Sequence, residues 1–185
     1  MPEVLIALAT GLTPAASALA MPAEPARRFF TSIVHELAAR FDAPLFEPHL
    51  TVYAGPEGAE DPNKILRRLF AGRDPFQLLV RDVQCSEQFT KTVFVQFEPD
   101  PRLAEISFAL RQASGSDETY ELNPHLSLIY KTMEAAVKSE LANSIRIPFR
   151  EVTFDSAKAV ACAVPIKTRE DVEAWRVLGT QEFTQ

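Results

Sequence analysis

Two stretches of this chain are nearly the same: Glu47-Pro48-His49-Leu50-Thr51-Val52-Tyr53 and Asn123-Pro124-His125-Leu126-Ser127-Leu128-Ile129-Tyr130. Each contains Pro-His-Leu followed by a hydroxyl residue and an apolar residue. The alternation of polar and apolar positions predicts a β-strand, in which residues two apart project from the same face. We therefore expect each histidine to share a face with the hydroxyl two positions later, while the leucine between them enters a core. The rest of the chain is expected to bring these two strands together.

Two imidazoles with two hydroxyls can perform acid–base chemistry on a phosphate without a metal. Histidine suits both roles because its unperturbed pKa lies near neutrality. In-line attack places the nucleophile and the leaving group on opposite sides of phosphorus, so His49 and His125 should face each other across it. Thr51 and Ser127 would then donate hydrogen bonds to the nonbridging oxygens and stabilise the charge of the transition state.

Two other interpretations of the repeated motif stay open. The histidines could be core residues on equivalent strands of a pseudo-symmetric fold. They could also be metal ligands, because histidine is the commonest metal ligand in proteins. No Asp, Glu or Cys recurs at the motif spacing to complete a coordination sphere. We therefore expect neither a metal nor a cofactor.

The pair His49-Leu50-Thr51 and His125-Leu126-Ser127 resembles the two His-x-Ser/Thr motifs of the 2H phosphoesterase superfamily, most closely those of its cyclic phosphodiesterase branch. The resemblance implies an α+β fold that is bilobal and pseudo-twofold, with two antiparallel sheets flanking a central groove and helices on the outside. Residues 1–185 would form a single domain of two intertwined lobes. The resemblance covers these parts of the chain: Leu37–Phe41, Phe46–His49, Phe89–Phe97, Asn123–His125 and the tail with Trp175.

The resemblance also implies an activity, which is the hydrolysis of a small ribose cyclic phosphate. The implied substrates are a nucleoside 2′,3′-cyclic phosphate or ADP-ribose 1″,2″-cyclic phosphate. By analogy with the family, His125 is the base and His49 the acid, although the sequence itself is symmetric on this point. The alternatives are an RNA-end or 2′-5′ phosphodiesterase or ligase of the same superfamily, and a noncatalytic nucleotide-binding module. Intact histidines and hydroxyls in both motifs speak against the last.

Further substrate-binding candidates are implied by the same resemblance. Tyr130 matches an aromatic residue that the family places five positions after the second histidine, but strict alternation would turn it into the core unless a bulge intervenes. Thr90 and Lys91 stand where relatives fold a loop towards the substrate, although Lys91 could also be a plain edge-strand charge. By alternation, Lys131 and Tyr53 fall on the histidine faces as well.

The composition of the chain indicates which kinds of molecule the protein can bind. A net charge of −6 over 185 residues argues against avid binding of long nucleic acid, which needs a basic surface. The charge does not argue against a small phosphate ester as the bound substrate. We expect the protein to be a monomer. The N-terminus carries Glu3 where a signal peptide would be basic, and no apolar stretch is long enough to span a bilayer. We therefore expect a cytoplasmic protein with no membrane association. Cys85 and Cys162 are expected to be buried thiols, with a disulfide left open.

Local patterns predict the order of elements along the chain. Helical spacing predicts that one helix face is formed by Phe30, Val34, Leu37, Ala38 and Phe41, and that His35 is partly exposed. Asp61 is expected to cap the next helix. The first strand contains no aromatic residue that could stack on a base. In chain order, the expected elements are a strand Glu3–Ala9, a loop Gly11–Ala20, a helix Glu24–Phe41, a motif strand Phe46–Tyr53, a helix Asp61–Phe70, strands Phe76–Val83 and Phe89–Phe97, a helix Pro99–Gln112, the second motif strand, a helix Met133–Ala142, a hairpin of Ile145–Phe154 and Lys158–Ile166 that turns at Asp155-Ser156, a linker Lys167–Asp171 and a last strand Glu173–Phe183.

Overall fold

The structure is a computed structural model that describes residues 13–56, 60–115 and 121–184. The predicted strand Glu3–Ala9 lies outside these residues. The α+β class is confirmed. The elements are β1 (Thr13–Pro22), α2 (Ala26–Phe41), β2 (Leu50–Pro56), α3 (Pro62–Phe70), β3 (Phe76–Cys85), the 3-10 turn η1 (Phe89–Lys91), β4 (Val93–Phe97), α4 (Pro101–Ser114), β5 (His125–Ile129), α5 (Ala135–Ser144), β6 (Glu151–Val164), α6 (Arg169–Glu173) and β7 (Arg176–Glu182).

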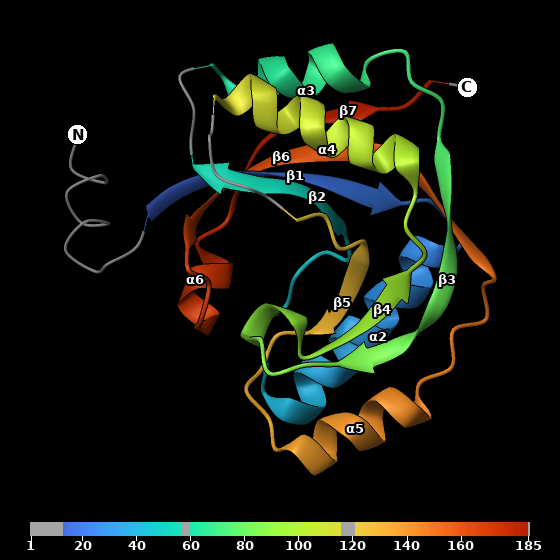
Figure 1. The fold of residues 1–185 in the computed structure, drawn as a ribbon. Helices are drawn as coiled ribbons and strands as arrows, with labels where there is room; N and C mark the ends of the chain where they lie inside the picture. Colours follow the sequence, from blue (N-terminus) through green and yellow to red (C-terminus); the bar gives the residue numbers. More distant parts are fainter. Residues whose placement is uncertain (1–12, 57–59, 116–120, 185) are drawn as a thin grey trace.

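The strands form one antiparallel sheet in the order β1-β2-β5-β4-β3-β6-β7. The start of β6 pairs with β3, and the rest of β6 lies between β1 and β7. The two expected sheets are therefore two halves of one hydrogen-bonded sheet that share β6. One half contains β2, β1, β6 and β7, and the other contains β5, β4, β3 and the start of β6 (Figure 1).

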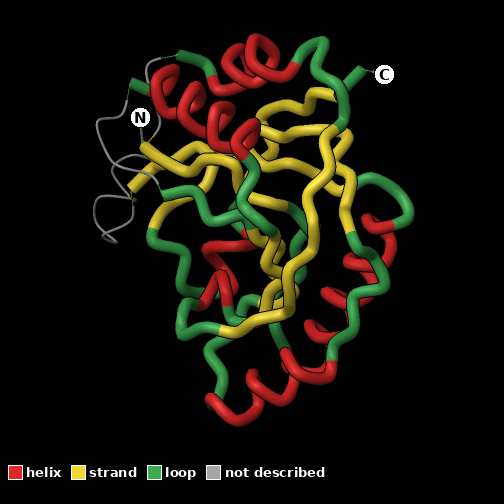
Figure 2. The backbone as a smooth tube through the Cα atoms, turned by 45° about the vertical axis from the view of Figure 1, so that its right-hand side comes forward, coloured by secondary structure: helices red, strands yellow, loops and turns green. Residues whose placement is uncertain are grey.

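Helices cover the outer side of each half. In one half, α4 packs against β2 and α3 against β7; in the other, α2 packs against β5 and α5 against β3. The backbone view shows the strands between these helices (Figure 2). The motif strands β2 and β5 are neighbours in the sheet, where the two halves meet. This arrangement agrees with the pseudo-twofold fold that the resemblance implied.

The predicted helices form where the sequence supplies an apolar face, an N-terminal cap, or both. On the expected face of α2, Phe30, Val34, Leu37 and Ala38 are buried and Phe41 is partly buried, whereas His35 is exposed. Asp61 accepts a hydrogen bond of 2.9 Å from the Asn63 N–H and so caps α3, as expected. Asp100 caps α4 in the same way, with Pro101 at the first helical position.

The loop predicted over Gly11–Ala20 is wrong for its described part, because residues 13–22 form strand β1. Alanine is a poor strand former, which favoured the loop on sequence grounds. In the structure β1 lies between β2 and β6, with Ala15 and Ala20 buried. Close packing on both sides selects small side chains here and overrides the local propensity.

The hairpin predicted at Asp155-Ser156 is also wrong, because β6 runs through this pair without a turn. Asp155 pairs with Arg27 of α2 at 2.8 Å, and Ser156 donates a hydrogen bond of 3.1 Å to the Asp155 carboxylate. The Asp155 carbonyl accepts from Phe183 beside β7. The polar groups that suggested a turn are thus used by neighbouring elements. Residues 145–150 are not a strand.

Two shorter segments differ from expectation. Residues Phe89–Lys91 form the turn η1 and not the start of a strand, because Ser86 Oγ donates to the Lys91 carbonyl at 2.6 Å and closes the turn. The linker expected over Lys167–Asp171 contains the start of α6, where Thr168 and Asp171 form a capping box. The expectation that both cysteines are buried is wrong, because Cys85 and Cys162 are partly exposed free thiols. Among the described residues, no helix has the length and apolar character needed to cross a membrane.

Candidate active site

The two motifs meet through a single residue pair, Leu50 of β2 with Leu126 of β5. Each leucine follows its motif histidine, and both are fully buried, as alternation predicted. Because the pairing is antiparallel, the positions flanking this pair are His49 with Ser127 and Thr51 with His125. Each histidine is therefore level with the hydroxyl of the other motif. The sequence of one motif alone does not predict this pairing of each histidine with the hydroxyl of the other motif, because it depends on how the two strands align.

Both motif strands contain a β-bulge one residue after the hydroxyl. Val52 has no partner in the β1–β2 register, and Leu128 has none in the β4–β5 register. A bulge shifts the alternation, so side chains beyond it change faces. Tyr130 consequently lies at the same cavity as His125, which strict alternation would have prevented. For the same reason Tyr53 leaves the face of His49, so its predicted position on that face is wrong.

Backbone hydrogen bonds fix the tautomer of both histidines. His49 Nδ1 lies 2.7 Å from the Glu47 carbonyl, and His125 Nδ1 lies 2.7 Å from the Asn123 carbonyl. A carbonyl can only accept, so Nδ1 carries the hydrogen in both rings. Nε2 is left as the nitrogen that can exchange a proton with a substrate. The same contact to the residue two positions earlier occurs in each half of the fold.

A cavity of about 200 Å³ lies between the motifs. It brings together five of the seven predicted site residues: His49, Thr51, Thr90, His125 and Tyr130. Strand β1 and the end of β6 form the opposite wall, which sequence reasoning did not place at the site. The wall residues include Ser17, Leu19, Val160, Cys162 and Val164.

The other two predicted site residues lie outside this cavity. Ser127 is 4% exposed, and its hydroxyl donates a hydrogen bond of 2.7 Å to the Thr90 carbonyl. Ser127 thus holds η1 against β5 in the structure described. Lys91 lies in a neighbouring groove that shares His125 with the cavity. The Lys131 ammonium donates to the Asp42 carbonyl at 3.0 Å and does not line the cavity.

Aromatic side chains surround His49, which is only 5% exposed. Phe46 stacks on Tyr130 with ring centroids 3.9 Å apart, and the Trp175 ring meets His49 edge-on at 5.7 Å. The Tyr130 hydroxyl lies 3.5 Å from His49 Nε2, at the limit of a hydrogen bond. The Trp175 Nε1 is buried without a hydrogen-bond partner among the described residues. The roles of Phe46 and Trp175 were missed, because neither follows the repeat.

Burial controls the charge of the site. It lowers the pKa of His49 below its ordinary value, against the opposing effect of the Glu47 carbonyl and carboxylate. Burial also lowers the pKa of His125 to about 4, and the nearby charges of Lys91 and His49 act in the same direction. Burial raises the pKa of the Tyr130 hydroxyl, which therefore stays neutral and can donate a hydrogen bond. With nothing bound, both imidazoles are neutral at pH 7.

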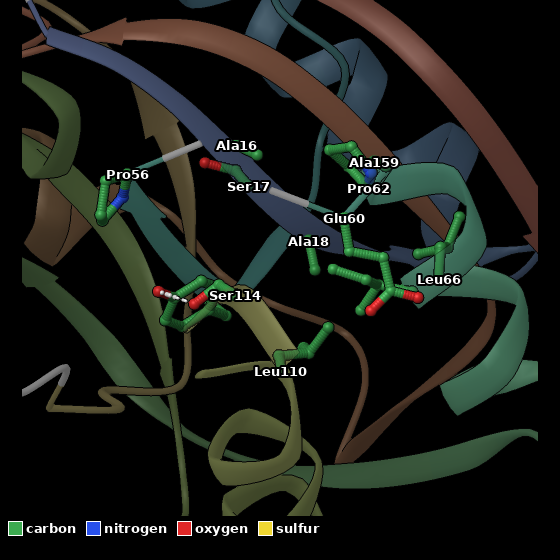
Figure 3. Close-up of a pocket in the computed structure, with 12 residues that line it drawn as sticks. Ala16, Ser17, Ala18, Pro56, Glu60, Pro62, Leu66, Leu110, Ser114 and Ala159 are labelled. Carbon is green, nitrogen blue, oxygen red and sulfur yellow. Dashed lines mark hydrogen bonds between the residues drawn. The ribbon is translucent and has the colours of Figure 1, made fainter. Parts of the chain in front are cut away.

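A smaller cavity of about 40 Å³ lies on the other face of β1 and β2, beneath α3 and α4 (Figure 3). It is lined mainly by apolar side chains such as Ala18, Leu66 and Leu110. At its edge, the Tyr53 hydroxyl and Ser114 Oγ form a hydrogen bond of 2.8 Å. Among the described residues, its lining includes no histidine and so lacks the paired acid and base of the larger cavity. We interpret it as a packing gap between the sheet and the helices.

The described residues contain no group of three or more His, Cys, Asp or Glu side chains placed to hold a metal ion. The cavity brings together the two motif histidines, the hydroxyl residues Thr51 and Thr90, and the aromatic side chains of Tyr130 and Trp175. This combination, on two half-sheets related by a pseudo-twofold axis, defines the class of two-histidine phosphoesterases.

Comparisons with known proteins agree with this class. The chain belongs to the cyclic phosphodiesterase-like protein family, which it matches over residues 15–183. The resemblance to 2H phosphoesterases and the expected enzyme class, a phosphodiesterase, are thereby confirmed.

Individual relatives span nearly the whole chain. The cyclic phosphodiesterase of Arabidopsis thaliana is 26% identical over 167 residues, which cover 88% of this chain and 92% of that protein. The fold is similar to that of E. coli LigT, crystallised with 3′-AMP, at 20% identity and a TM-score of 0.57, over 94% of this chain and 99% of LigT. It is also similar to the protein TT0787 of Thermus thermophilus, at 16% identity and a TM-score of 0.58, over 91% and 97% of the two chains.

Proposed function

We propose that this protein hydrolyses a small ribose cyclic phosphate, with His125 as general base and His49 as general acid. The observation that carries the proposal is the matched pair of imidazoles at one cavity, each with Nδ1 bonded to its own backbone and Nε2 left for proton transfer. The family supports the reaction class. A nucleoside 2′,3′-cyclic phosphate and ADP-ribose 1″,2″-cyclic phosphate are the proposed substrates.

The reaction needs one proton in the pair of histidines. The anionic phosphate raises the pKa of both rings when it binds, so that one proton is retained at neutral pH. The His125 Nε2 accepts a proton from water as the water oxygen attacks phosphorus. The bond from phosphorus to the departing ribose oxygen breaks, and the His49 Nε2 donates its proton to that oxygen. The product is a phosphomonoester, and proton exchange with solvent restores the pair.

Exposure favours this division of roles. His125 is the more exposed ring, so water reaches phosphorus from its side. His49 is enclosed by Phe46, Trp175 and Tyr130, which exclude water from the side of the leaving oxygen. Thr51 and the neutral Tyr130 hydroxyl are the proposed donors to the phosphate oxygens, because both line the cavity. Ser127 acts with them if its hydroxyl turns from the Thr90 carbonyl.

The test is the hydrolysis of a 2′,3′-cyclic nucleotide by wild-type protein and by His49→Ala and His125→Ala. We expect each substitution to lower kcat by about 10²–10⁴-fold, the usual effect of removing a positioned acid or base. His35→Ala is the matched control, because this third histidine is exposed on α2, and it should retain wild-type activity. Wild-type activity should also persist in EDTA, since the proposed steps use side chains alone.

Two outcomes would contradict the proposal. Wild-type rates in His125→Ala would exclude it as the base, and activity that EDTA abolishes and zinc restores would require a metal mechanism. A 4-nitrophenyl phosphodiester tests the roles separately, because its leaving group needs no proton. If His49→Ala is as impaired on this substrate as on the cyclic nucleotide, His49 is not the acid. Cleavage of a short RNA in preference to the cyclic nucleotide would favour the RNA-end alternative.

A further inference from the structure

A second, larger groove adjoins the catalytic cavity on the side of His125. It has a volume of about 620 Å³ and is open to solvent. His125 lines both spaces, so a molecule whose phosphate lies between the histidines can extend into this groove. Its walls are polar and come from β3, the residues around η1, β4 and the segment before β5. They include Arg81, Gln84, Gln88, Lys91 and Asn123.

The groove holds two cationic side chains, Arg81 and Lys91, in a protein whose net charge is −6. Among the residues that the structure describes, neither forms an ion pair with a carboxylate. The acidic lining residue is Glu121, which is exposed. The nearby Asp82 carboxylate accepts a hydrogen bond of 2.9 Å from Gln84. Two cations are thus available to an anion that enters the groove.

Local structure places both cations in the groove that His125 also lines. The Lys91 ammonium lies 4.4 Å from the centre of the Phe94 ring, and that ring meets the His125 ring edge-on at 5.5 Å. Partial burial lowers the pKa of Lys91. Arg81 is the extra residue of a β-bulge, because Val80 pairs with Phe97 while Asp82 pairs with Gln96. A bulge turns a side chain out of the regular alternation, which here places Arg81 in the groove.

We propose that this groove binds a second phosphate of the substrate, with Arg81 and Lys91 as its ligands. The substrate class is then a ribose cyclic phosphate that carries at least one further phosphate on the same molecule. This inference rests on the proposed function, since it assumes that a cyclic phosphate occupies the neighbouring cavity. It assigns the substrate-binding candidate Lys91 to the distal phosphate.

The experiment compares kcat/KM for adenosine 2′,3′-cyclic phosphate with and without a 5′-phosphate. We expect wild-type protein to prefer the 5′-phosphorylated form by roughly 3–10-fold, because a charge-assisted but solvent-exposed contact has a modest effect. In Arg81→Gln this ratio should fall towards one. Arg67→Gln is the matched control, because Arg67 is exposed on α3 in the other half, and it should keep the wild-type ratio. High salt should reduce the wild-type ratio by screening.

Two further substrates distinguish the sources of the second phosphate. ADP-ribose 1″,2″-cyclic phosphate supplies a diphosphate, and a dinucleotide ending in a 2′,3′-cyclic phosphate supplies the internal phosphate of an RNA end. A gain with any phosphorylated substrate that Arg81→Gln removes supports the groove, and the substrate with the largest gain identifies the source. Equal kcat/KM for all substrates, in wild-type protein and in Arg81→Gln, would overturn this inference and leave the proposed hydrolysis intact. If no cyclic phosphate is cleaved, the proposed function itself fails.

Discussion

At the residue scale, the main feature is the equivalent backbone contact of His49 and His125. Each Nδ1 donates to the carbonyl two residues earlier, so neither ring depends on a carboxylate to fix its tautomer. A partner carboxylate would hold a proton on the ring, whereas here burial lowers the pKa of each ring by more than the hydrogen bond to the carbonyl raises it. The free site is consequently a neutral pair that gains its proton with an anionic ligand.

This feature predicts different pH profiles for the free enzyme and its complex. In the proposed mechanism only the singly protonated pair is productive, and in the free enzyme this form exists between two apparent pKa values that both lie below 6.5. The optimum of kcat/KM should therefore lie on the acid side of pH 6.5, with a fall as the pH rises further. The bound phosphate raises the pKa of both rings, so the optimum of kcat should lie at higher pH. Steady-state kinetics from pH 4 to pH 9 measure both profiles. A kcat/KM that rises through pH 7–8 would contradict the lowered pKa values.

Residue patterns explain how much of the site could be predicted. His49, His125 and Thr51 were found because chemistry and strand periodicity coincide in the repeat. Trp175 and Arg81 could not be found in this way, because their positions depend on β7 and on a bulge in β3. Nothing in a local pattern specifies which distant segments will lie against the motif strands.

At the element scale, the bulges at Val52 and Leu128 reverse which face of the sheet the later side chains of each motif strand occupy. Beyond the Val52 bulge, the Tyr53 ring crosses Gly55, where a Cβ atom would lie 2.0 Å from the Tyr53 hydroxyl. The hydroxyl then reaches Ser114 at the end of α4. Tyr53 is therefore a structural contact between sheet and helix, outside the cavity that the two motif histidines line.

Removal of this contact should affect stability and leave catalysis unchanged. Tyr53→Phe should lower the free energy of unfolding by about 1 kcal/mol, the usual net effect of losing one hydrogen bond. Ser114→Ala removes the other partner and also the hydrogen bond of 2.8 Å that Ser114 Oγ donates to the Arg111 carbonyl, so it should cost more than Tyr53→Phe. The double variant should cost little more than Ser114→Ala alone, because the bond to Tyr53 is then already lost. Urea unfolding measures the stability, and steady-state kinetics provide the control. A large loss of kcat with unchanged stability would place Tyr53 at the site instead.

The elements that were predicted correctly have local causes, and those that were missed do not. Helices α3 and α4 begin at an Asp-Pro pair, which is both a cap and a start signal. Four of the ten residues of strand β1 are alanine, a composition that indicates a loop until two neighbouring strands pair with it. The Asp155-Ser156 pair indicates a turn until Arg27 and the end of β7 use its polar groups.

At the scale of the whole molecule, the two buried histidines couple stability to pH. Their pKa values are lower in the folded protein than the ordinary 6.5, and that of His125 falls to about 4. Between these values the unfolded chain binds more protons than the folded one. The contribution of these two histidines to the free energy of unfolding should therefore be complete above pH 6.5 and should fall as the pH drops towards 4.

Variants separate this effect from general acid denaturation. His125→Gln should show a smaller loss of stability over the same pH interval, because its side chain does not titrate. His35→Gln should behave as the wild type, since His35 is exposed. Urea midpoints at pH 4, 5, 6 and 7 measure the difference. An identical pH dependence in all three proteins would show that His125 does not contribute.

The position of β6 has a consequence for synthesis on the ribosome. Strand β1 begins at Thr13, whereas its partner β6 spans Glu151–Val164, near the other end of the chain. As the nascent chain emerges, β1 can pair with β2 but has an open edge until β6 is translated, and β6 is also the strand that joins the two halves. Contacts this distant in sequence form slowly, and an unpaired edge can recruit other chains. An incomplete chain that ends before Glu151 is thus expected to depend on chaperones, although it already contains both motif histidines.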